Sequence, residues 1–240
     1  MGHKWLKWVL FFTSAGAVCY FLYAVTADHM VKTAALLEHL PATIVIDPGH
    51  GGEDGGAVSL TGQPESRFNL EIGQKLDQLL RFCGIRTCLT RQEDISLHTG
   101  DCKTIAEKKR SDLKNRVTMV NAIPGAVLVS IHQNHFSDPQ YSGAQVFYAR
   151  TDGSQSLAEQ SQDLLRTVLA PSNHRDCYPS ESVYLMQKIL CPGILVECGF
   201  LSHPQEEQQL QEPAYQIKIA CALGGAITQF LQERDQYGQV

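Results

Sequence analysis

The chain has 240 residues, 43% of them apolar and 19% charged, and a formal net charge of −5 at neutral pH. After an apolar N-terminal segment, about 200 residues remain, which is enough for one domain with a substantial core and leaves no long disordered tract. The acidic balance and the lack of a nucleic-acid-binding motif exclude a basic footprint for nucleic acid, so we expect no such partner.

The N-terminal segment has the pattern of an export signal. Lys4 and Lys7 precede an uncharged, largely apolar run from Trp8 to Ala27, and Asp28 follows it. A run of about 20 apolar residues can cross the hydrocarbon core as a helix, and positive charge before it orients the rest of the chain outward. We therefore expect an extracytoplasmic domain that is either membrane-anchored or secreted.

Two interpretations of this segment remain open. Val25–Ala27 is an acceptable cleavage tripeptide for a signal peptide, whereas the length of the run and the bulky Tyr23 near its end favour an uncleaved anchor. We predict three segments: residues 1–27 are the signal anchor or signal peptide, 28–41 form a linker, and 42–240 form the folded domain.

Eight cysteines are present, of which Cys19 lies in the apolar segment and seven lie in the domain. Seven cysteines cannot all pair within one chain, so export does not predict a complete set of disulfides. We expect Cys83, Cys88, Cys198 and Cys221 to behave as small apolar residues, because they fall within apolar stretches.

From residue 42 on, short apolar runs alternate with amphipathic stretches. In chain order we predict a strand at 43–47, a helix at 64–83, a strand at 85–90, a helix capped by Ser111 that ends before Pro124, strands at 126–131 and 143–148, a helix through 157–168, strands at 183–186 and 194–197, and a last helix at 213–231. The alternation indicates a single α/β domain with a mostly parallel or mixed twisted sheet between helix layers.

A glycine-rich loop follows the first predicted strand, in the run Asp47-Pro48-Gly49-His50-Gly51-Gly52. Glycines let the backbone turn tightly and keep bulk away from His50, which suits a side chain that binds a shared metal. A glycine-rich turn with an incidental histidine is the alternative interpretation of this run taken alone.

Three further polar residues stand at the ends of predicted elements. His132 follows a buried strand, Glu65 begins the helix after the glycine-rich loop, and Glu197 ends another apolar strand. Sites of α/β folds lie at the carboxyl edge of the sheet. Two histidines and one carboxylate are a common catalytic zinc set, and a separate glutamate can serve as general base. Because these residues are scattered along the chain, their types and spacing alone indicate only a candidate metallohydrolase.

Ordered motifs carry a more specific resemblance. The sequence contains, in this order, TIVIDPGHGGEDGGAV, ESRFNLEI, LTRQED, NRVTMVNA, VSIHQNHF, SGAQVFYA and PGILVECGFLSHPQEE, followed by the last helix. Over residues 42–233 it resembles the zinc-dependent N-acetylmuramoyl-L-alanine amidases (amidase type 3). The short layout without a wall-binding module is most similar to the germination-specific amidase of spore formers, which helps to make the muramic-lactam of spore cortex.

This resemblance implies that residues 42–240 are a catalytic domain that hydrolyses the amide between N-acetylmuramic acid and L-alanine in peptidoglycan. It implies that His50, Glu65 and His132 bind Zn2+, and that Glu197 is the general base towards the zinc-activated water. Glu197 would then return the proton to the departing alanine nitrogen.

Other polar residues near these motifs are alternatives. Glu71 could replace Glu65 as the second ligand, but Glu65 keeps the spacing of the family to Asn69 and Leu70. Glu53 is expected to be solvated or to lie beside the ligands. We expect His135 on the surface or beside the ligands, because three ligands and water already complete an open zinc site.

The basic residues of the domain are expected to have structural or solvent roles. Arg91 and Arg116 should bind carboxylates or carbonyls that fix the fold, rather than substrate. The stretch 92–110 contains Lys108, Lys109 and further basic residues, and it either borders the substrate groove or is a solvated charge run, which we favour.

Two other functions remain open. A zinc peptidase or carbohydrate deacetylase could use the same metal chemistry on another bond. A catalytically silent peptidoglycan-binding or regulatory domain would be expected to have lost a ligand or the base, whereas all four positions are filled here. The expected partners are peptidoglycan (its stem peptide and N-acetylmuramic acid), the membrane through the N-terminal segment, and an activating protein of the kind that some family members need.

Overall fold

A mixed sheet forms the centre of the computed structural model, which describes residues 20, 23 and 42–237. Its strands are β1 (Thr43–Pro48), β2 (Arg86–Leu89), β3 (Ala126–Asn134), β4 (Gln145–Tyr148), β5 (Tyr178–Pro179) and β6 (Gly193–Phe200), in the spatial order β2-β1-β3-β6-β4-β5. Strands β2, β1, β3 and β6 pair in parallel, whereas β4 runs antiparallel to β6 and pairs in parallel with β5. The predicted single α/β domain with a mixed sheet is therefore confirmed for the described part of the chain.

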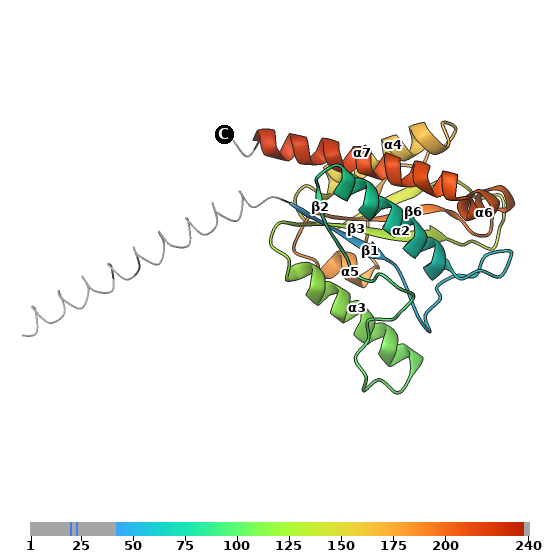
Figure 1. The fold of residues 1–240 in the computed structure, drawn as a ribbon, viewed down its shortest axis with the longest axis horizontal. Helices are drawn as coiled ribbons and strands as arrows, with labels where there is room; N and C mark the ends of the chain where they lie inside the picture. Colours follow the sequence, from blue (N-terminus) through green and yellow to red (C-terminus); the bar gives the residue numbers. More distant parts are fainter. Residues whose placement is uncertain (1–19, 21–22, 24–41, 238–240) are drawn as a thin grey trace, which may run out of the picture. The chain divides into compact units, whose positions relative to one another are not determined.

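Helices cover both faces of this sheet (Figure 1). They are α2 (Glu65–Phe82), α3 (Ile105–Asn121), α4 (Ser154–Leu169), α5 (Tyr184–Lys188), α6 (Pro204–Gln211) and α7 (Pro213–Tyr237). Helices α2, α4 and α7 pack against one face, and α3 and α5 lie on the other. The carboxyl ends of the parallel strands consequently open at one edge, between the two helix layers.

The central strands are apolar on both sides because both sides are covered. Along β3, Val127, Val129 and Ile131 pack into the core under α2, α4 and α7, whereas Ala126 and Leu128 pack towards α3 and α5. Ser130 and His132 follow Ala126 and Leu128 at every second position, so their side chains lie on the same face of the sheet. The side chain of His132 thus leaves the sheet on the α3 and α5 side, at the carboxyl end of its strand.

Two predicted elements are wrong in type or extent. Residues 183–186 form part of helix α5 rather than a strand, and Leu185, Met186 and Ile189 bury one side of this short helix. The N-cap of helix α3 is Thr104, seven residues before the predicted cap at Ser111, and it forms a capping box with Glu107. The apolar face that marks α3 begins only in its second half, so the periodicity did not reveal its charged first turns.

Two elements were not predicted. Strand β5 is the edge strand of the sheet and has only two residues, which is too short for apolar periodicity to give a signal. Helix α6 has no strong apolar stripe, but His203 caps its first turn by accepting a hydrogen bond from the Glu206 backbone N–H, and Pro204 follows as its first residue. A proline directly after a cap is the signal that could have revealed this helix.

The predicted apolar segment Trp8–Ala27 lies outside the described residues, apart from Tyr20 and Tyr23. Within the part of the chain that is described, no helix is long and apolar enough to span a bilayer. The described cysteines are free thiols. Cys198 is buried, as expected, whereas Cys83, the C-cap of α2, and Cys221, on α7, are exposed.

Candidate active site

Three side chains that could hold a metal ion meet at the carboxyl edge of the sheet. His50 follows β1, Glu65 is the first residue of α2, and His132 lies in the last part of β3; their donor atoms are all within 4.8 Å of one another. His50 Nε2 lies 3.2 Å from Glu65 Oε2, and His132 Nδ1 lies 2.9 Å from Glu65 Oε1. The structure thus brings together the three residues that the resemblance implied as ligands.

The pKa of Glu65 reflects this position between two histidines. Burial alone would raise the pKa of the carboxyl, but hydrogen bonds and charge from His132 and His50 hold it well below its usual range. The backbone N–H groups of Ala57 and Gln133 also donate to its two oxygens, at 3.0 and 3.2 Å. Glu65 is therefore an anionic carboxylate, and backbone N–H groups orient both of its oxygens.

Glycines make the room in which these side chains meet. A Cβ atom on Gly49 would lie 2.2 Å from the His132 ring. A Cβ atom on Gly56, whose φ is +72°, would lie 2.5 Å from Glu65 Oε2 and 2.8 Å from His50 Cδ2. A side chain at either position would displace His132, Glu65 or His50, so the glycine-rich sequence is a steric requirement for their convergence.

His50 itself has a backbone conformation that ordinary residues rarely adopt. Its φ is 61°, and it is the only non-glycine residue with a positive φ in the described residues. Arg116 donates from Nη2 to the His50 carbonyl at 2.7 Å and from Nη1 to the Pro48 carbonyl at 2.9 Å. Arg91 donates from Nε to Pro48 O at 2.9 Å and from Nη2 to Gly49 O at 3.0 Å. Two buried guanidinium groups therefore hold the turn, which confirms the structural role predicted for them.

Arg116 is in turn held by buried carboxylates. Its Nη1 lies 2.6 Å from Asp47 Oδ1, and its Nε lies 2.6 Å from Asp112 Oδ2. Thr90 and Ser130 also donate to Asp47. Burial alone would raise the pKa of Asp47, but the Arg116 charge and these hydrogen bonds keep it below its usual value. The network connects α3 to the turn that carries His50.

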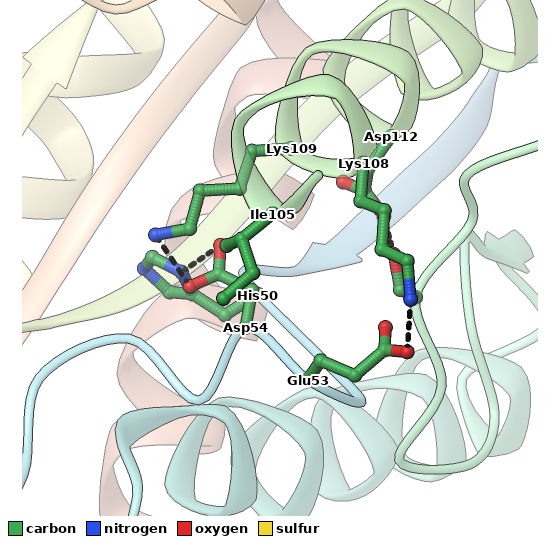
Figure 2. Close-up of a pocket in the computed structure, with 8 residues that line it drawn as sticks. His50, Glu53, Asp54, Ile105, Lys108, Lys109 and Asp112 are labelled. Carbon is green, nitrogen blue, oxygen red and sulfur yellow. Dashed lines mark hydrogen bonds and ion pairs between the residues drawn. The ribbon is translucent and has the colours of Figure 1, made fainter. Parts of the chain in front are cut away.

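Asp54 orients the imidazole of His50. Its Oδ2 lies 3.1 Å from His50 Nδ1, and its Oδ1 lies 2.8 Å from Lys109 Nζ on α3 (Figure 2). Burial lowers the pKa of His50, but the hydrogen bonds to Asp54 and Glu65 outweigh it and raise the pKa to about 9. With Nδ1 directed at Asp54, Nε2 is the ring nitrogen that faces the donor atoms of Glu65 and His132.

Sequence reasoning missed both Asp54 and Lys109 as parts of the site. Asp54 stands four residues after His50 within the glycine-rich loop, and this local spacing was the available signal. Lys109 was assigned to a solvated charge run. Instead it pairs with Asp54, while Lys108 pairs with Glu53, so the first turns of α3 are tied to the glycine-rich loop (Figure 2).

Glu197 lies on β6, directly beside His132 of β3 in the parallel strand pair. Its Oε2 is buried, and no described polar group forms a hydrogen bond with it. Burial raises the pKa of Glu197 to about 7, against the opposing effect of the nearby His132. Glu65 and Glu197 are thus two carboxylates in one site with widely separated pKa values, which suits one for binding a cation and the other for moving a proton.

The alternative residues lie elsewhere. Glu71 accepts hydrogen bonds from Arg67 and Gln216 and is not part of the donor cluster. Glu53 is exposed and pairs with Lys108, as expected for a solvated carboxylate. His135 is exposed and also lies outside the donor cluster.

Comparisons with known proteins agree with this geometry. The family model described as N-acetylmuramoyl-L-alanine amidase matches residues 44–229. The chain is 35% identical over 193 residues to the germination-specific N-acetylmuramoyl-L-alanine amidase of Bacillus subtilis (strain 168), a match that covers 80% of each protein. It is 28% identical over 259 residues to N-acetylmuramoyl-L-alanine amidase AmiA of Escherichia coli (strain K12), covering 86% of this chain and 85% of AmiA.

A solved structure shows the same fold. The CwlD amidase from Clostridioides difficile, determined in complex with the GerS lipoprotein, superposes with a TM-score of 0.77 at 37% sequence identity. The superposition covers 80% of this chain and 98% of that one. Both the sheet and the helix layers described above are therefore shared with a protein of known structure.

Proposed function

The chain belongs to the N-acetylmuramoyl-L-alanine amidase family, and we propose that it is a zinc-dependent hydrolase of the amide between N-acetylmuramic acid and L-alanine in peptidoglycan. The observation that carries the proposal is the convergence of His50, Glu65 and His132 beside Glu197, whose buried Oε2 has no hydrogen-bond partner among the described residues. Family membership supports the choice of the amide bond that is hydrolysed, and the arrangement of the site supports the chemistry of its hydrolysis.

The donor set fits zinc. Two imidazole nitrogens and one carboxylate are a common protein set for a catalytic zinc ion, and they leave a position open for water or substrate. His50, Glu65 and His132 would hold the ion. When bound, zinc polarises a carbonyl oxygen and makes a water molecule more acidic.

Glu197 is the proposed general base. A pKa raised to about 7 lets its carboxylate accept a proton near neutral pH and release it again. Glu197 would remove a proton from the water that attacks the amide carbon, and the C–N bond would break as Glu197 returns the proton to the alanine nitrogen. The products are the free lactyl carboxylate and a stem peptide with a free L-alanine amine.

The test uses the full-length chain purified in mild detergent. It is incubated with purified peptidoglycan, with and without a zinc chelator, and the products are identified by mass spectrometry. We expect release of peptides that begin with a free L-alanine amine, loss of release with chelator, and recovery when zinc is restored. Cleavage at another bond, or cleavage that is indifferent to chelation throughout, would contradict the proposal.

The cellular setting is a second part of the proposal. Two relatives are named as probable cell wall amidases, so we propose that the catalytic domain lies outside the cytoplasm, associated with the membrane through residues 1–27. The similarity to a germination-specific amidase favours spore cortex as the peptidoglycan that is cut. Fractionation of cells, with immunodetection of the chain in membrane and soluble fractions, tests the location. Parallel digestion of cortex and vegetative peptidoglycan tests the substrate.

A protein partner is the third part. The structure of the CwlD amidase contains the GerS lipoprotein, and we propose that an exported lipoprotein of this kind also binds and activates this chain. The hydrolysis rate of the purified chain alone is compared with the rate after addition of candidate exported lipoproteins. A rate that none of them changes would contradict a requirement for activation by such a protein.

A further inference from the structure

Arg175, in the loop between α4 and β5, has an unusually fixed guanidinium group. Its Nε donates to Ser142 O at 3.0 Å and its Nη1 to Gln145 Oε1 at 3.0 Å, while its Cζ lies 5.0 Å from the centroid of the Phe200 ring. The backbone N–H of Arg175 is also bound, by Asn173 Oδ1 at 3.0 Å. This side chain is held in place before any ligand arrives.

The charge of Arg175 has no counter-ion in the part of the chain that the structure describes. The neighbouring Asp176 instead faces Arg166, at 3.9 Å. Glu206, which lines the same cavity as Arg175, accepts hydrogen bonds from the backbone N–H groups of Gly143 and Phe200, each at 2.8 Å. A partly buried cation that forms no ion pair with a described carboxylate can bind an external anion.

The position of Arg175 connects it to the candidate active site. Glu197 pairs with His132 on one side and with Gln145 on the other, so these three residues form a row across β3, β6 and β4. Directly paired residues share a face of the sheet, and Gln145 is the residue that binds Arg175. Adjacent strands are about 4.8 Å apart, so Gln145 lies one strand spacing from Glu197. Arg175 lies in the loop that leads into β5, one strand further, which places its guanidinium roughly 10 Å from the position of Glu197.

The cations on the other side of the metal-binding cluster are already paired. Lys108 and Lys109, at the start of α3, form ion pairs with Glu53 and Asp54 (Figure 2). Their charges support the glycine-rich loop that carries His50. Arg175 is therefore the better candidate for recognising a charged part of the substrate.

The chemistry of peptidoglycan indicates which part this is. The N-acetylated sugars carry no charge once the lactyl group is amide-linked, whereas the stem peptide carries free carboxylates. The residue after L-alanine is a glutamate linked through its side-chain carboxyl, which leaves its α-carboxylate free. Two extended residues span about 7 Å, which is comparable to the distance between Glu197 and the Arg175 guanidinium. We infer that Arg175 binds this α-carboxylate and so directs the stem peptide towards β4, an inference that rests on the proposed amidase activity.

The test compares two N-acetylmuramoyl peptides that differ only in whether this α-carboxyl group is a free acid or an amide. A charge-assisted hydrogen bond contributes about 1.5–3 kcal/mol, so we expect the full-length chain to prefer the acid by about 10- to 100-fold in kcat/KM. Arg175→Gln should lower kcat/KM for the acid by the same factor and leave the amide almost unchanged. Arg175→Lys should retain part of the preference. The matched control is Arg150→Gln, since Arg150 is exposed and pairs with Glu181.

A variant that loses activity equally on both substrates would show a purely structural role for Arg175, and unchanged preference would also overturn the inference. Binding of both peptides is measured by calorimetry in the Glu197→Gln background, with and without Arg175→Gln. If the unmodified chain hydrolyses neither peptide, the proposed function is contradicted. The role of Arg175 is still tested in that case, because the calorimetry shows whether the double variant loses the preference for binding the acid. The two failures are therefore distinguishable.

Discussion

His50 Nδ1 lies 3.1 Å from Asp54 Oδ2, and Asp54 is held on its other side by Lys109. This contact fixes the ring orientation of His50 and directs its Nε2 towards Glu65 and His132. A carboxylate behind a metal-binding histidine typically raises ligand basicity and selects the tautomer. Metal binding should therefore depend on a residue that does not touch the metal.

Asp54→Asn should weaken zinc affinity by about 10- to 100-fold while the protein stays folded, because such outer contacts contribute this much to metal sites. Competition with a chromophoric zinc chelator measures the affinity. The control is Glu53→Gln, which removes an adjacent carboxylate that pairs only with Lys108 and should leave affinity unchanged. Equal zinc affinity in Asp54→Asn and the unmodified chain would refute the role of Asp54.

Glu197→Gln should separate metal binding from turnover. The amide keeps the shape of the side chain but cannot take a proton, so we expect zinc affinity within a few-fold and a loss of about 10²- to 10⁴-fold in kcat. Steady-state hydrolysis of a muropeptide and the same zinc competition measure the two quantities. Retained turnover would require another residue as the base.

Glu197 should also make the metal-free protein less stable as the pH rises. Its folded pKa is raised from 4.5 to about 7, so the folded state keeps a proton that the unfolded state has already lost. Stability therefore falls as the pH increases through the window between these two values. Glu197→Gln removes this penalty, and the variant should become the more stable protein by about 1–3 kcal/mol at pH 8. Urea unfolding in chelator at pH 4.5 and pH 8 measures the difference, which should be small at the lower pH.

Arg116→Met should destabilise the fold by about 3–5 kcal/mol, because it leaves the buried carboxylate of Asp47 without its partner. The folded pKa of Asp47 is lowered, so its contribution is present above the ordinary value and is lost as the pH falls below it. Destabilisation should accordingly shrink below about pH 3.8. Denaturant unfolding measures both effects. Arg150→Met removes an exposed ion pair instead and should cost at most about 1 kcal/mol.

The sequence indicated those parts of the fold that depend on burial. The apolar runs of β1, β3 and β6 predicted strands, and polar residues at their ends predicted where His50, His132 and Glu197 would meet. Residues 183–186 show the limit, since a short apolar run is compatible with a strand or with helix α5. Lys109 and Arg175 show another limit, because their contacts with Asp54 and Gln145 join residues that lie far apart along the chain.

Gly56→Ala should abolish zinc binding, whereas Gly62→Ala should preserve it. Both glycines have positive φ values, +72° and +84°, so an alanine at either position costs about 1–2 kcal/mol of backbone strain. They differ in what a Cβ atom would meet. At Gly62 there is no atom within 4 Å, whereas at Gly56 the Cβ would collide with Glu65 Oε2 and His50 Cδ2. If both variants lose a similar amount of thermal stability but only Gly56→Ala loses zinc affinity, Gly56 is required because it makes room for the zinc-binding side chains. Equal zinc affinity in the two variants would show that the ligands can move aside and still bind the ion.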